Sequence, residues 1–516
     1  MMMSHSRIMD RDLSLDAVRR SSRYGVALMA AMALAGCSVF QQRDQMAQFN
    51  TAYTQGNYAI AASAMQFDQK GDDKGGNHVL ELLHQGEAYR LEGEFHDSIA
   101  AFDKAEAGMK YLDTEGFASS ATENVMSVLV NESTRDYRAL MSEAIMVNTY
   151  KGLSFLAEGN SEYARVEFNR ADDRTRRAVD FFSEEIAEQR RALQNDPQNA
   201  RMVQRSVQSE GMRSVLEAHY GDPSGWSVYP NYIVPASTYL HGLYFLASGE
   251  GGSDIERAST SLSRVADMVP GNTVAKADAQ LAADLASGRQ SRSDLPPMVW
   301  VLYENGLGPV LEEIRFDVPL FISHGDRASV IFTSIALPRY RERSAVAGSL
   351  TAQSGSTETA RTQNLAQMGK VISTEMQARF PSVLTRAISG AVVKGMIQHQ
   401  ATESLGVAGQ LGSIIYTLAT TQADLRGWQA LPDHWEIARL GRPADGEVIL
   451  GDTARGTLGT VDVPDQPFTL IYVKRPTAQA PATVMLLDLE GRRSGQCYTL
   501  ASGEDERRPC TVQDAL

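Results

Sequence analysis

Few side chains of this chain have the types and spacing that catalysis needs. The sequence lacks a G-x-S-x-G turn, an H-E-x-x-H helix, a phosphate-binding G-x-x-x-x-G-K loop and a C-x-x-C pair. Two strings place a histidine near an aspartate, namely His324-Gly325-Asp326 and Asp433-His434-Trp435. Residues so close in sequence rarely converge on one substrate, and we interpret both strings as turns. The sequence therefore predicts a protein that is not an enzyme, with no catalytic residue and no cofactor.

Three histidines in the first part of the chain lie near one another in sequence. His78, His84 and His96 are separated by gaps of six and twelve residues. These gaps do not place two imidazoles on one face of a helix as a pair of metal ligands would require. We expect structural or surface histidines and no metal site.

A charged and aromatic cluster late in the chain allows two interpretations. It consists of Asp424, Arg426 and Trp428. In the structural interpretation, which we favour, Arg426 pairs with a carboxylate and Trp428 buries its ring to hold a returning helix on a sheet. In the functional interpretation the three side chains line a groove between two domains.

One cysteine carries the clearest chemical signal. Arg19, Arg20 and Arg23 precede an apolar run, and Leu34-Ala35-Gly36-Cys37 ends that run. A positive start, an apolar middle and a small-residue cleavage site are typical of a secretory signal. With its cysteine the string resembles a bacterial lipoprotein signal, which implies that residues 1–36 are removed and that Cys37 is acylated. An ordinary signal peptide, or an N-terminal helix with a chance cysteine, is the alternative.

The predicted lipid anchor and the net charge restrict the classes of molecule that the chain is expected to bind. Ser38 follows the cysteine, and the same resemblance implies export to the periplasmic face of the outer membrane, with residues 37–45 as a lipidated tether. Residues 37–516 contain 44 basic and 60 acidic residues and no basic block. Nucleic acid is excluded as a partner because phosphate binding needs concentrated positive charge. We expect the lipid to be the membrane attachment.

Two further cysteines lie near the end of the chain. Cys497 and Cys510 are 13 residues apart in a segment rich in Gly, Arg and Pro. Because an exported protein meets an oxidising compartment, we predict a disulfide between them. Two free thiols or metal ligands are the alternative, without nearby histidines to support it.

The first half of the chain repeats a pattern of small and aromatic residues. The first copy starts at Gly86 and the second at Gly152, with matching residues at the same offsets. The third copy starts at Gly242 and carries a four-residue insertion around Gly251-Gly252-Ser253. A weaker copy precedes them, with Phe49, Gly56 and Tyr58. The predicted repeat core consists of Gly86, Tyr89, Ser98, Phe102, Ala105, Gly152, Phe155, Ala164, Phe168, Ala171, Gly242, Phe245, Ala258 and Leu262.

This spacing predicts helical hairpins. Small residues such as Gly86 and Ser98 let two antiparallel helices approach, while Tyr89 and Phe102 fill the space between them. The pattern resembles the tetratricopeptide repeat, a helix-turn-helix unit of about 34 residues. The copies are 66 and 90 residues apart, so extra helices must intervene, for example Ala178–Gln194 and Met202–His219. We predict an all-α, tetratricopeptide-like solenoid over residues 46–290; unrelated helical hairpins are the alternative.

The second half changes character. Ser291–Pro297 has the composition of a linker, and Val299–Tyr303 reads as a buried strand. Further strands are predicted at Val310–Phe316, Ser329–Ala336, Glu436–Arg439, Glu447–Leu450, Phe468–Val473 and Thr483–Leu489. Residues 298–516 are therefore predicted to form a β-rich domain, sandwich or barrel-like. The fold class as a whole is α+β and multidomain.

A helical insertion interrupts this domain at about residues 357–422. Apolar residues recur there every three to four positions, followed by Gly- and Ala-rich stretches between Ile388 and Ile415. We favour a buried helical hairpin packed on the sheet. The alternative is an oligomerising or membrane-inserting helical pair, since small residues let helices pack closely, although Lys394, His399 and Glu403 interrupt any membrane-length span.

Three strings of the second half resemble an uncharacterised family of proteobacterial outer-membrane lipoproteins. They are Val299–Pro309, Phe316–Pro319 and Ala423–Pro432. The resemblance implies an envelope role but no biochemical activity. We expect a lipid-anchored periplasmic scaffold that binds other envelope proteins through its helical repeats, in peptidoglycan synthesis or secretion. A self-assembling lipoprotein that forms homo-oligomers through the Gly-rich helices is the second hypothesis, and an envelope hydrolase is the third.

Overall fold

The computed structural model describes residues 42–67, 78–110, 137–194, 197–222, 226–229, 234–324, 327–343, 348–355, 358–420, 422–501 and 507–510. The chain divides into two compact units, Met1–Gln48 and Phe49–Leu516. Residues 42–48 of the first unit are helical. Cys37 and the predicted signal lie outside the described residues.

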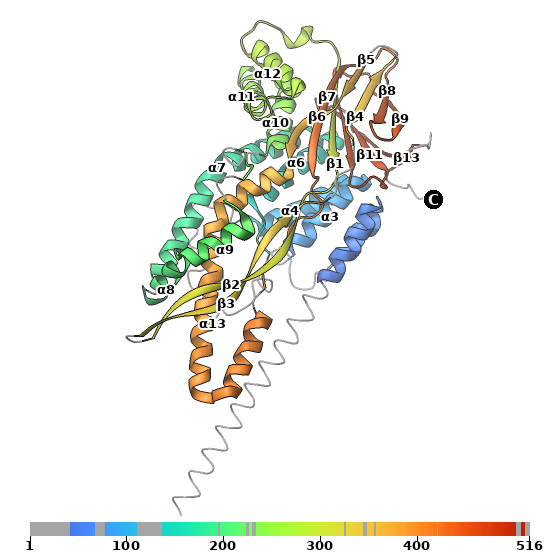
Figure 1. Ribbon diagram of the computed structural model, residues 1–516. Helices are drawn as coiled ribbons and strands as arrows, with labels where there is room; N and C mark the ends of the chain where they lie inside the picture. The colour runs from blue at the N-terminus through green and yellow to red at the C-terminus, as the bar shows by residue number, and fades with distance from the viewer. Residues whose placement is uncertain are drawn as a thin grey trace, which may run out of the picture. The chain divides into compact units, whose positions relative to one another are not determined.

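Helices fill the N-terminal half of the second unit and sheets fill most of the C-terminal half (Figure 1). The helices that follow residue 57 are α2 (Tyr58–Ala64), α3 (Val79–Glu92), α4 (Phe95–Gly108), α6 (Met141–Ala157), α7 (Ser161–Gln194), α8 (Pro197–Val207), α9 (Glu210–Tyr220), α10 (Pro235–Ser248), α11 (Gly252–Met268) and α12 (Thr273–Ala286). The expectation of a mixed protein with its helices first is confirmed.

The three predicted repeat glycines are in close contact with the residue sixteen or twenty positions later. A Cβ atom on Gly86 of α3 would lie 2.8 Å from the ring of Phe102 on α4. On Gly152 of α6 it would lie 2.9 Å from the ring of Phe168 on α7, and on Gly242 of α10 it would lie 2.7 Å from Cγ of Leu262 on α11. Each glycine therefore lets the second helix of a pair press its apolar side chain against the backbone of the first.

The other residues of the predicted repeat core differ in burial. Tyr89 and Phe155 are only half-buried. Phe155 of α6 stacks on Tyr163 of α7, so it contributes to the contact between the two helices of its pair. The buried members are Ser98, Ala105, Ala164, Ala171, Phe245 and Ala258.

The helices between the copies are arranged differently from the prediction. Residues 178–194 are not a separate helix but the continuation of α7, which runs through 34 residues. Residues 202–219 span two helices, α8 and α9, because the chain turns at Ser209, whose hydroxyl accepts a hydrogen bond from the Met212 amide as the N-cap of α9.

The C-terminal half contains a seven-stranded sheet in the order β13-β12-β11-β10-β1-β7-β6 and a four-stranded sheet in the order β5-β4-β8-β9. β1 pairs in parallel with β10, and the other pairings of both sheets are antiparallel. The strands are β1 (Met298–Asn305), β4 (Leu350–Ser354), β5 (Glu358–Arg361), β6 (Gln363–Gln367), β7 (His434–Gly441), β8 (Glu447–Asp452), β9 (Gly456–Asp462), β10 (Phe468–Arg475), β11 (Ala482–Asp488), β12 (Gln496–Leu500) and β13 (Arg508–Pro509).

The centre of the seven-stranded sheet is buried on both faces, and every residue of β1, β10 and β11 is buried. Val299, Val301 and Tyr303 belong to an apolar cluster shared with the four-stranded sheet. The alternate residues face the helices: the Trp300 indole donates to Asp278 of α12, and Tyr150 of α6 donates to Glu304. A strand covered on both sides reads as a continuous apolar run in sequence, as Val299–Tyr303 does.

A long hairpin and a long helix form a separate layer. The hairpin pairs β2 (Val310–His324) with β3 (Arg327–Arg341), and α13 (Met368–Thr420) follows β6. One face of the hairpin packs with α8, α9 and the first half of α13 in a second apolar cluster. The helical insertion thus packs mainly on this hairpin rather than on the large sheet (Figure 1).

The predicted linker Ser291–Pro297 contains a short 3-10 helix, Arg292–Asp294. Arg292 donates to the Gly249 carbonyl and pairs with Glu490, so it connects the helical half to the segment after β11. The division into two domains stays a prediction. Residues 49–516 form one compact unit.

Candidate functional site

The segment that carries Asp424, Arg426 and Trp428 lines a groove between the helices and the β2–β3 hairpin. We call it the interface groove; its volume is about 620 Å³. Four parts of the chain line it: residues 137–143 at the start of α6, residues 309–311 and 338–340 of the hairpin, residues 372–386 of α13, and residues 424–431. The three residues singled out in the sequence thus line one groove inside the second unit, and its role in binding stays a prediction.

The contacts of Arg426 and Trp428 agree with part of the structural interpretation. Asp424 accepts two hydrogen bonds from the guanidinium of Arg426, at 2.8 and 2.7 Å. Trp428 is buried, and its ring lies edge-on to Phe102 and Tyr150, with centroids 5.7 Å apart in both cases. The expectation that Trp428 holds a helix on the sheet is wrong, because its ring packs on α4 and α6.

A buried carboxylate, Glu143, joins this segment to α6. Its oxygens accept hydrogen bonds from the Tyr137 hydroxyl, from the Leu140 amide at 2.8 Å and from the Trp428 amide at 2.8 Å. Burial raises the pKa of Glu143 to about 7, although these hydrogen bonds oppose the rise. The buried Glu143 carboxyl therefore holds its proton more tightly than an exposed glutamate does.

A second buried carboxylate, Glu375 of α13, caps the start of α6. It accepts hydrogen bonds from the Met141 amide at 2.8 Å, and from the amide and hydroxyl of Ser142. Burial raises the pKa of Glu375. The first N–H groups of a helix have no partner inside the helix, and Glu375 satisfies two of them at the point where α13 meets α6. Ser142 donates directly to Glu375, and this carboxylate is at the same time occupied by the two backbone amides at the start of α6.

Next to the groove lies a set of fully buried charges between α3 and the large sheet. Glu87 pairs with Arg90 at 2.7 Å and with Lys474 of β10 at 2.8 Å. Lys474 also pairs with Glu304 of β1 at 2.9 Å. Burial alone would raise the pKa of Glu87, but the two cations hold it below its usual range.

Aromatic groups complete this set. The Arg90 guanidinium lies over the rings of Tyr150 and Tyr472, 4.2 and 4.6 Å from their centroids. The Trp435 indole donates to Glu304 at 2.9 Å. Two acids and two bases with hydrogen bonds on every side leave no net charge, and this arrangement is structural. Sequence reasoning missed it, because no local pattern marks a polar residue that lies inside an apolar strand.

The histidines have structural environments. His84 is buried, contacts the Leu80 carbonyl through Nδ1 at 2.7 Å and accepts the Gln429 amide at Nε2. Burial lowers its pKa to about 4. His78 stacks on Phe67, and His96 is exposed. No group of three potential metal-ligating side chains occurs in the part of the chain that the structure describes.

His434 is not in a turn, as predicted, but begins β7. Its Nδ1 lies 2.7 Å from Asp433 and its Nε2 3.0 Å from Glu436. Burial alone would lower the pKa of His434, but the hydrogen bonds to these two carboxylates outweigh it and raise the pKa to about 9. For the other string, residues 325 and 326 lie outside the described residues, and His324 ends β2.

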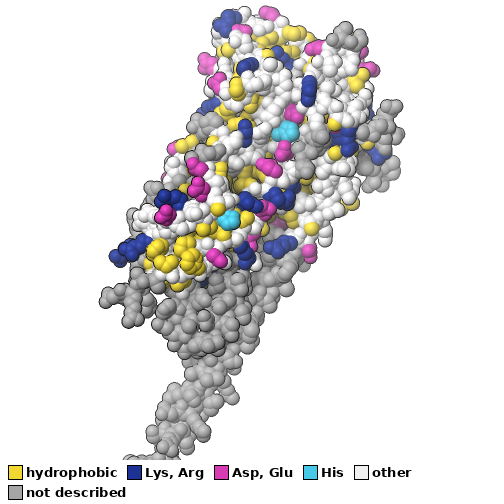
Figure 2. Space-filling view, viewed as in Figure 1, with side chains coloured by type: hydrophobic (Ala, Val, Ile, Leu, Met, Phe, Trp, Pro, Cys, Tyr) yellow, Lys and Arg dark blue, Asp and Glu magenta, His cyan; other side chains and the backbone are white. Residues whose placement is uncertain are grey.

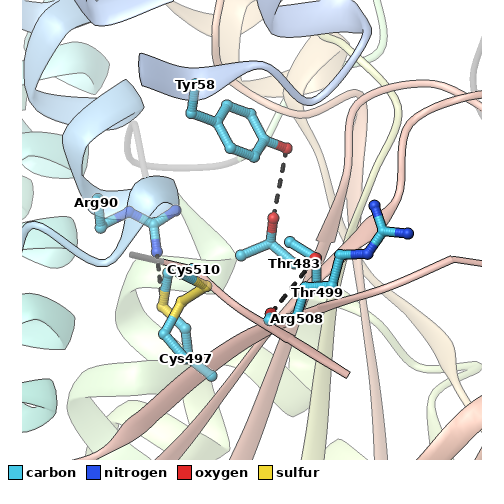
Figure 3. Close-up of a disulfide and its surroundings, with 8 residues drawn as sticks. Tyr58, Arg90, Thr483, Cys497, Thr499, Arg508 and Cys510 are labelled. Carbon is cyan, nitrogen blue, oxygen red and sulfur yellow. Dashed lines mark hydrogen bonds between the residues drawn. A yellow bond between two sulfur atoms is a disulfide. The ribbon is translucent and has the colours of Figure 1, made fainter. Parts of the chain in front are cut away.

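Cys497 and Cys510 are joined by a disulfide (Figure 3). Cys497 lies in β12, next to the edge strand β13 of the large sheet, and the Cys510 amide donates to the Cys497 carbonyl. The bond holds the two-residue strand β13 beside β12.

Comparison with known proteins gives no identification: no family model, curated protein or solved structure matches the chain. Within the described residues, no helix has both the length and the apolar character that crossing a membrane requires.

Proposed function

We propose that the chain is a lipid-anchored periplasmic scaffold, acylated at Cys37 and attached to the inner face of the outer membrane, that binds protein partners in envelope assembly. The interface groove is the observation that carries the binding role. It collects backbone and side chains from four distant segments, and its lining offers charged, polar and apolar groups. Such a lining suits the recognition of another polypeptide.

The helix pairs support the same proposal. The glycine contacts at Gly86, Gly152 and Gly242 recur in three antiparallel pairs, and we infer that these are divergent copies of a tetratricopeptide-like unit. Stacked repeats of this kind usually present an extended surface to a partner. Here α6 of the second pair provides one wall of the groove, so the repeats and the groove belong to one binding surface.

The proposed anchor is tested separately from the binding role. Cys37→Ala in the producing cell should release the chain from the membrane fraction after envelope fractionation. Cys497→Ser is the matched control, since it removes a cysteine without touching the proposed acylation site. An unchanged membrane-bound pool of the Cys37→Ala chain would refute the anchor and leave the binding role untouched.

The binding role is tested by site-directed photocrosslinking in intact cells. Arg138 is exposed at the groove, whereas Lys276 is exposed on α12 and does not line it. A photoreactive residue at position 138 should give a reproducible adduct that is absent at position 276. Arg386→Glu, which reverses a charge in the groove, should weaken that adduct. Equal adducts at both positions, or none at position 138, contradict the proposal.

Self-assembly remains the competing hypothesis, and the same experiment separates it. A position-138 adduct with the mass of two copies of the chain would favour it. Gly395, from the Gly-rich stretch that suggested it, lies against the β2–β3 hairpin: a Cβ there would be 2.9 Å from Ile322 and 3.0 Å from Ile331. Close packing inside the chain therefore explains this glycine without a second copy.

A further inference from the structure

A second cavity lies on the other side of Tyr340, which lines both it and the interface groove. We call it the α13 cleft; its volume is about 830 Å³. It opens between α9, the end of β3, residues 226–227 and the start of α13. In Figure 2 basic and acidic side chains lie close together in the middle of the visible face, over these elements. The volume is within the range of ligand-binding pockets.

Two cations in the α13 cleft have no carboxylate partner among the described residues. The guanidinium of Arg343 donates to the carbonyls of Gly308 and Gln429 at 2.5 and 2.6 Å, but Nη1 makes no hydrogen bond to a described residue. Lys370 makes no ion pair within the described chain; its ammonium lies 5.7 Å from the centre of the Tyr229 ring. Burial lowers the pKa of Arg343 to about 10, as expected for a positive charge that its surroundings do not compensate.

The α13 cleft also contains a negatively charged side chain, Glu342. Glu342 forms no ion pair or hydrogen bond among the described residues, and its carboxylate lies beside Gly369 in the first turn of α13. Burial and the nearby Asp433 raise the pKa of Glu342. A ligand that fits both charge types must carry an anion and also donate hydrogen bonds.

An aromatic wall completes the cleft. The Trp226 indole donates to the Tyr220 carbonyl at 3.1 Å, and both rings pack on Phe380. Phe380 therefore supports both rings, and the indole N–H of Trp226 already has a hydrogen-bond acceptor. The aromatic wall offers apolar surface, together with Met376, to a ligand side chain.

We propose that the α13 cleft binds the C-terminal end of a peptide, with the terminal carboxylate at Lys370 and Nη1 of Arg343, a backbone N–H at Glu342 and the last side chain against Trp226. A phosphate ion offers the charge but neither the N–H donors nor the apolar side chain. The site is distinct from the interface groove and does not depend on the lipid anchor. A partner of the proposed scaffold, or a free peptide, could supply such an end.

The experiment uses the purified full chain in detergent and a mixture of N-acetylated tripeptides with free C-terminal carboxylates. The probes for comparison are the same mixture amidated at the C-terminus, inorganic phosphate and glucuronate. Binding is measured by isothermal titration calorimetry. We expect saturable binding of the free acids at millimolar concentration or below, and at least fivefold weaker binding of the amides.

Two substitutions locate the site. Lys370→Gln should weaken binding of the free acids about fivefold or more, because Lys370 makes no hydrogen bond that the fold needs. Lys276→Gln, on α12 and remote from the cleft, is the matched control and should leave binding unchanged. Equal affinity for acids and amides, no saturable binding of the acids, phosphate or glucuronate binding as tight as that of the acids, or an unaffected Lys370→Gln variant would each overturn the proposal.

Discussion

His434 should make the stability of the fold depend on pH in the neutral to alkaline range. Its imidazole lies between Asp433 and Glu436, and its pKa is raised to about 9 from an ordinary value of 6.5. Because the folded pKa is the higher one, the folded state binds the proton more tightly than the unfolded state. The stabilisation is complete below pH 6.5 and is lost as the pH rises through 9.

The magnitude follows from the two pKa values. Linkage gives about 3 kcal/mol at pH 6, about 1.4 kcal/mol at pH 8 and about 0.2 kcal/mol at pH 9.5. His434→Gln removes the charge and leaves an amide that still forms hydrogen bonds. The substitution should therefore lower the free energy of unfolding more at pH 6 than at pH 9.5. The two losses should differ by about 3 kcal/mol.

The assay is urea unfolding of both proteins at several pH values between 6 and 9.5, followed by circular dichroism. Only the pH dependence of the difference matters, because a change in packing that does not depend on pH cancels in it. His96→Gln is the control, since the His96 side chain is exposed and its substitution should give a flat difference. Parallel curves for wild type and His434→Gln would refute the assignment of a charged, buried imidazole.

Three further substitutions test the packing. Gly152→Ala places a Cβ 2.9 Å from the buried ring of Phe168 and should lower the free energy of unfolding in urea by about 1–3 kcal/mol. Gly252→Ala is the control: the space around Gly252 is open, and its substitution should change stability by about 1 kcal/mol or less. Lys474→Met leaves two buried carboxylates with one cation and should cost about 3–5 kcal/mol by the same assay; a loss below 1 kcal/mol would contradict the buried network. Cys510→Ser should speed proteolytic trimming next to β13, as seen by mass spectrometry, with a global loss of about 3 kcal/mol at most.

Local spacing predicted much of the fold. The offsets from Gly86 to Phe102 and from Gly152 to Phe168 mark contacts between helices joined by a short turn, and the structure contains these contacts. A glycine with a left-handed backbone, Gly93 or Gly159, ends the first helix of each of these pairs. Such contacts can be predicted from spacing because both partners lie within twenty residues of each other in the sequence.

The groove could be predicted only in part, since its partners are far apart in sequence. Asp424 and Arg426 are two residues apart, and their types already indicated an ion pair. The contact of Trp428 with Glu143 spans 285 residues, and the pairing of Glu375 with Ser142 spans 233. Local spacing in the sequence does not predict which helix end a distant carboxylate will cap.

The buried charges lie where the helical half of the second unit meets the large sheet. Glu87 and Arg90 come from the helical half, and Lys474 and Glu304 come from the large sheet. If the halves separated, each would expose one ion pair to water. One face of β1 and β10 would also lose its cover. A solvated linker at residues 291–297 would not change this, because the interface lies elsewhere. The compositional change at Ser291 therefore marks where helices give way to strands, whereas the packing of the sheet against α3, α6 and α12 decides what folds together.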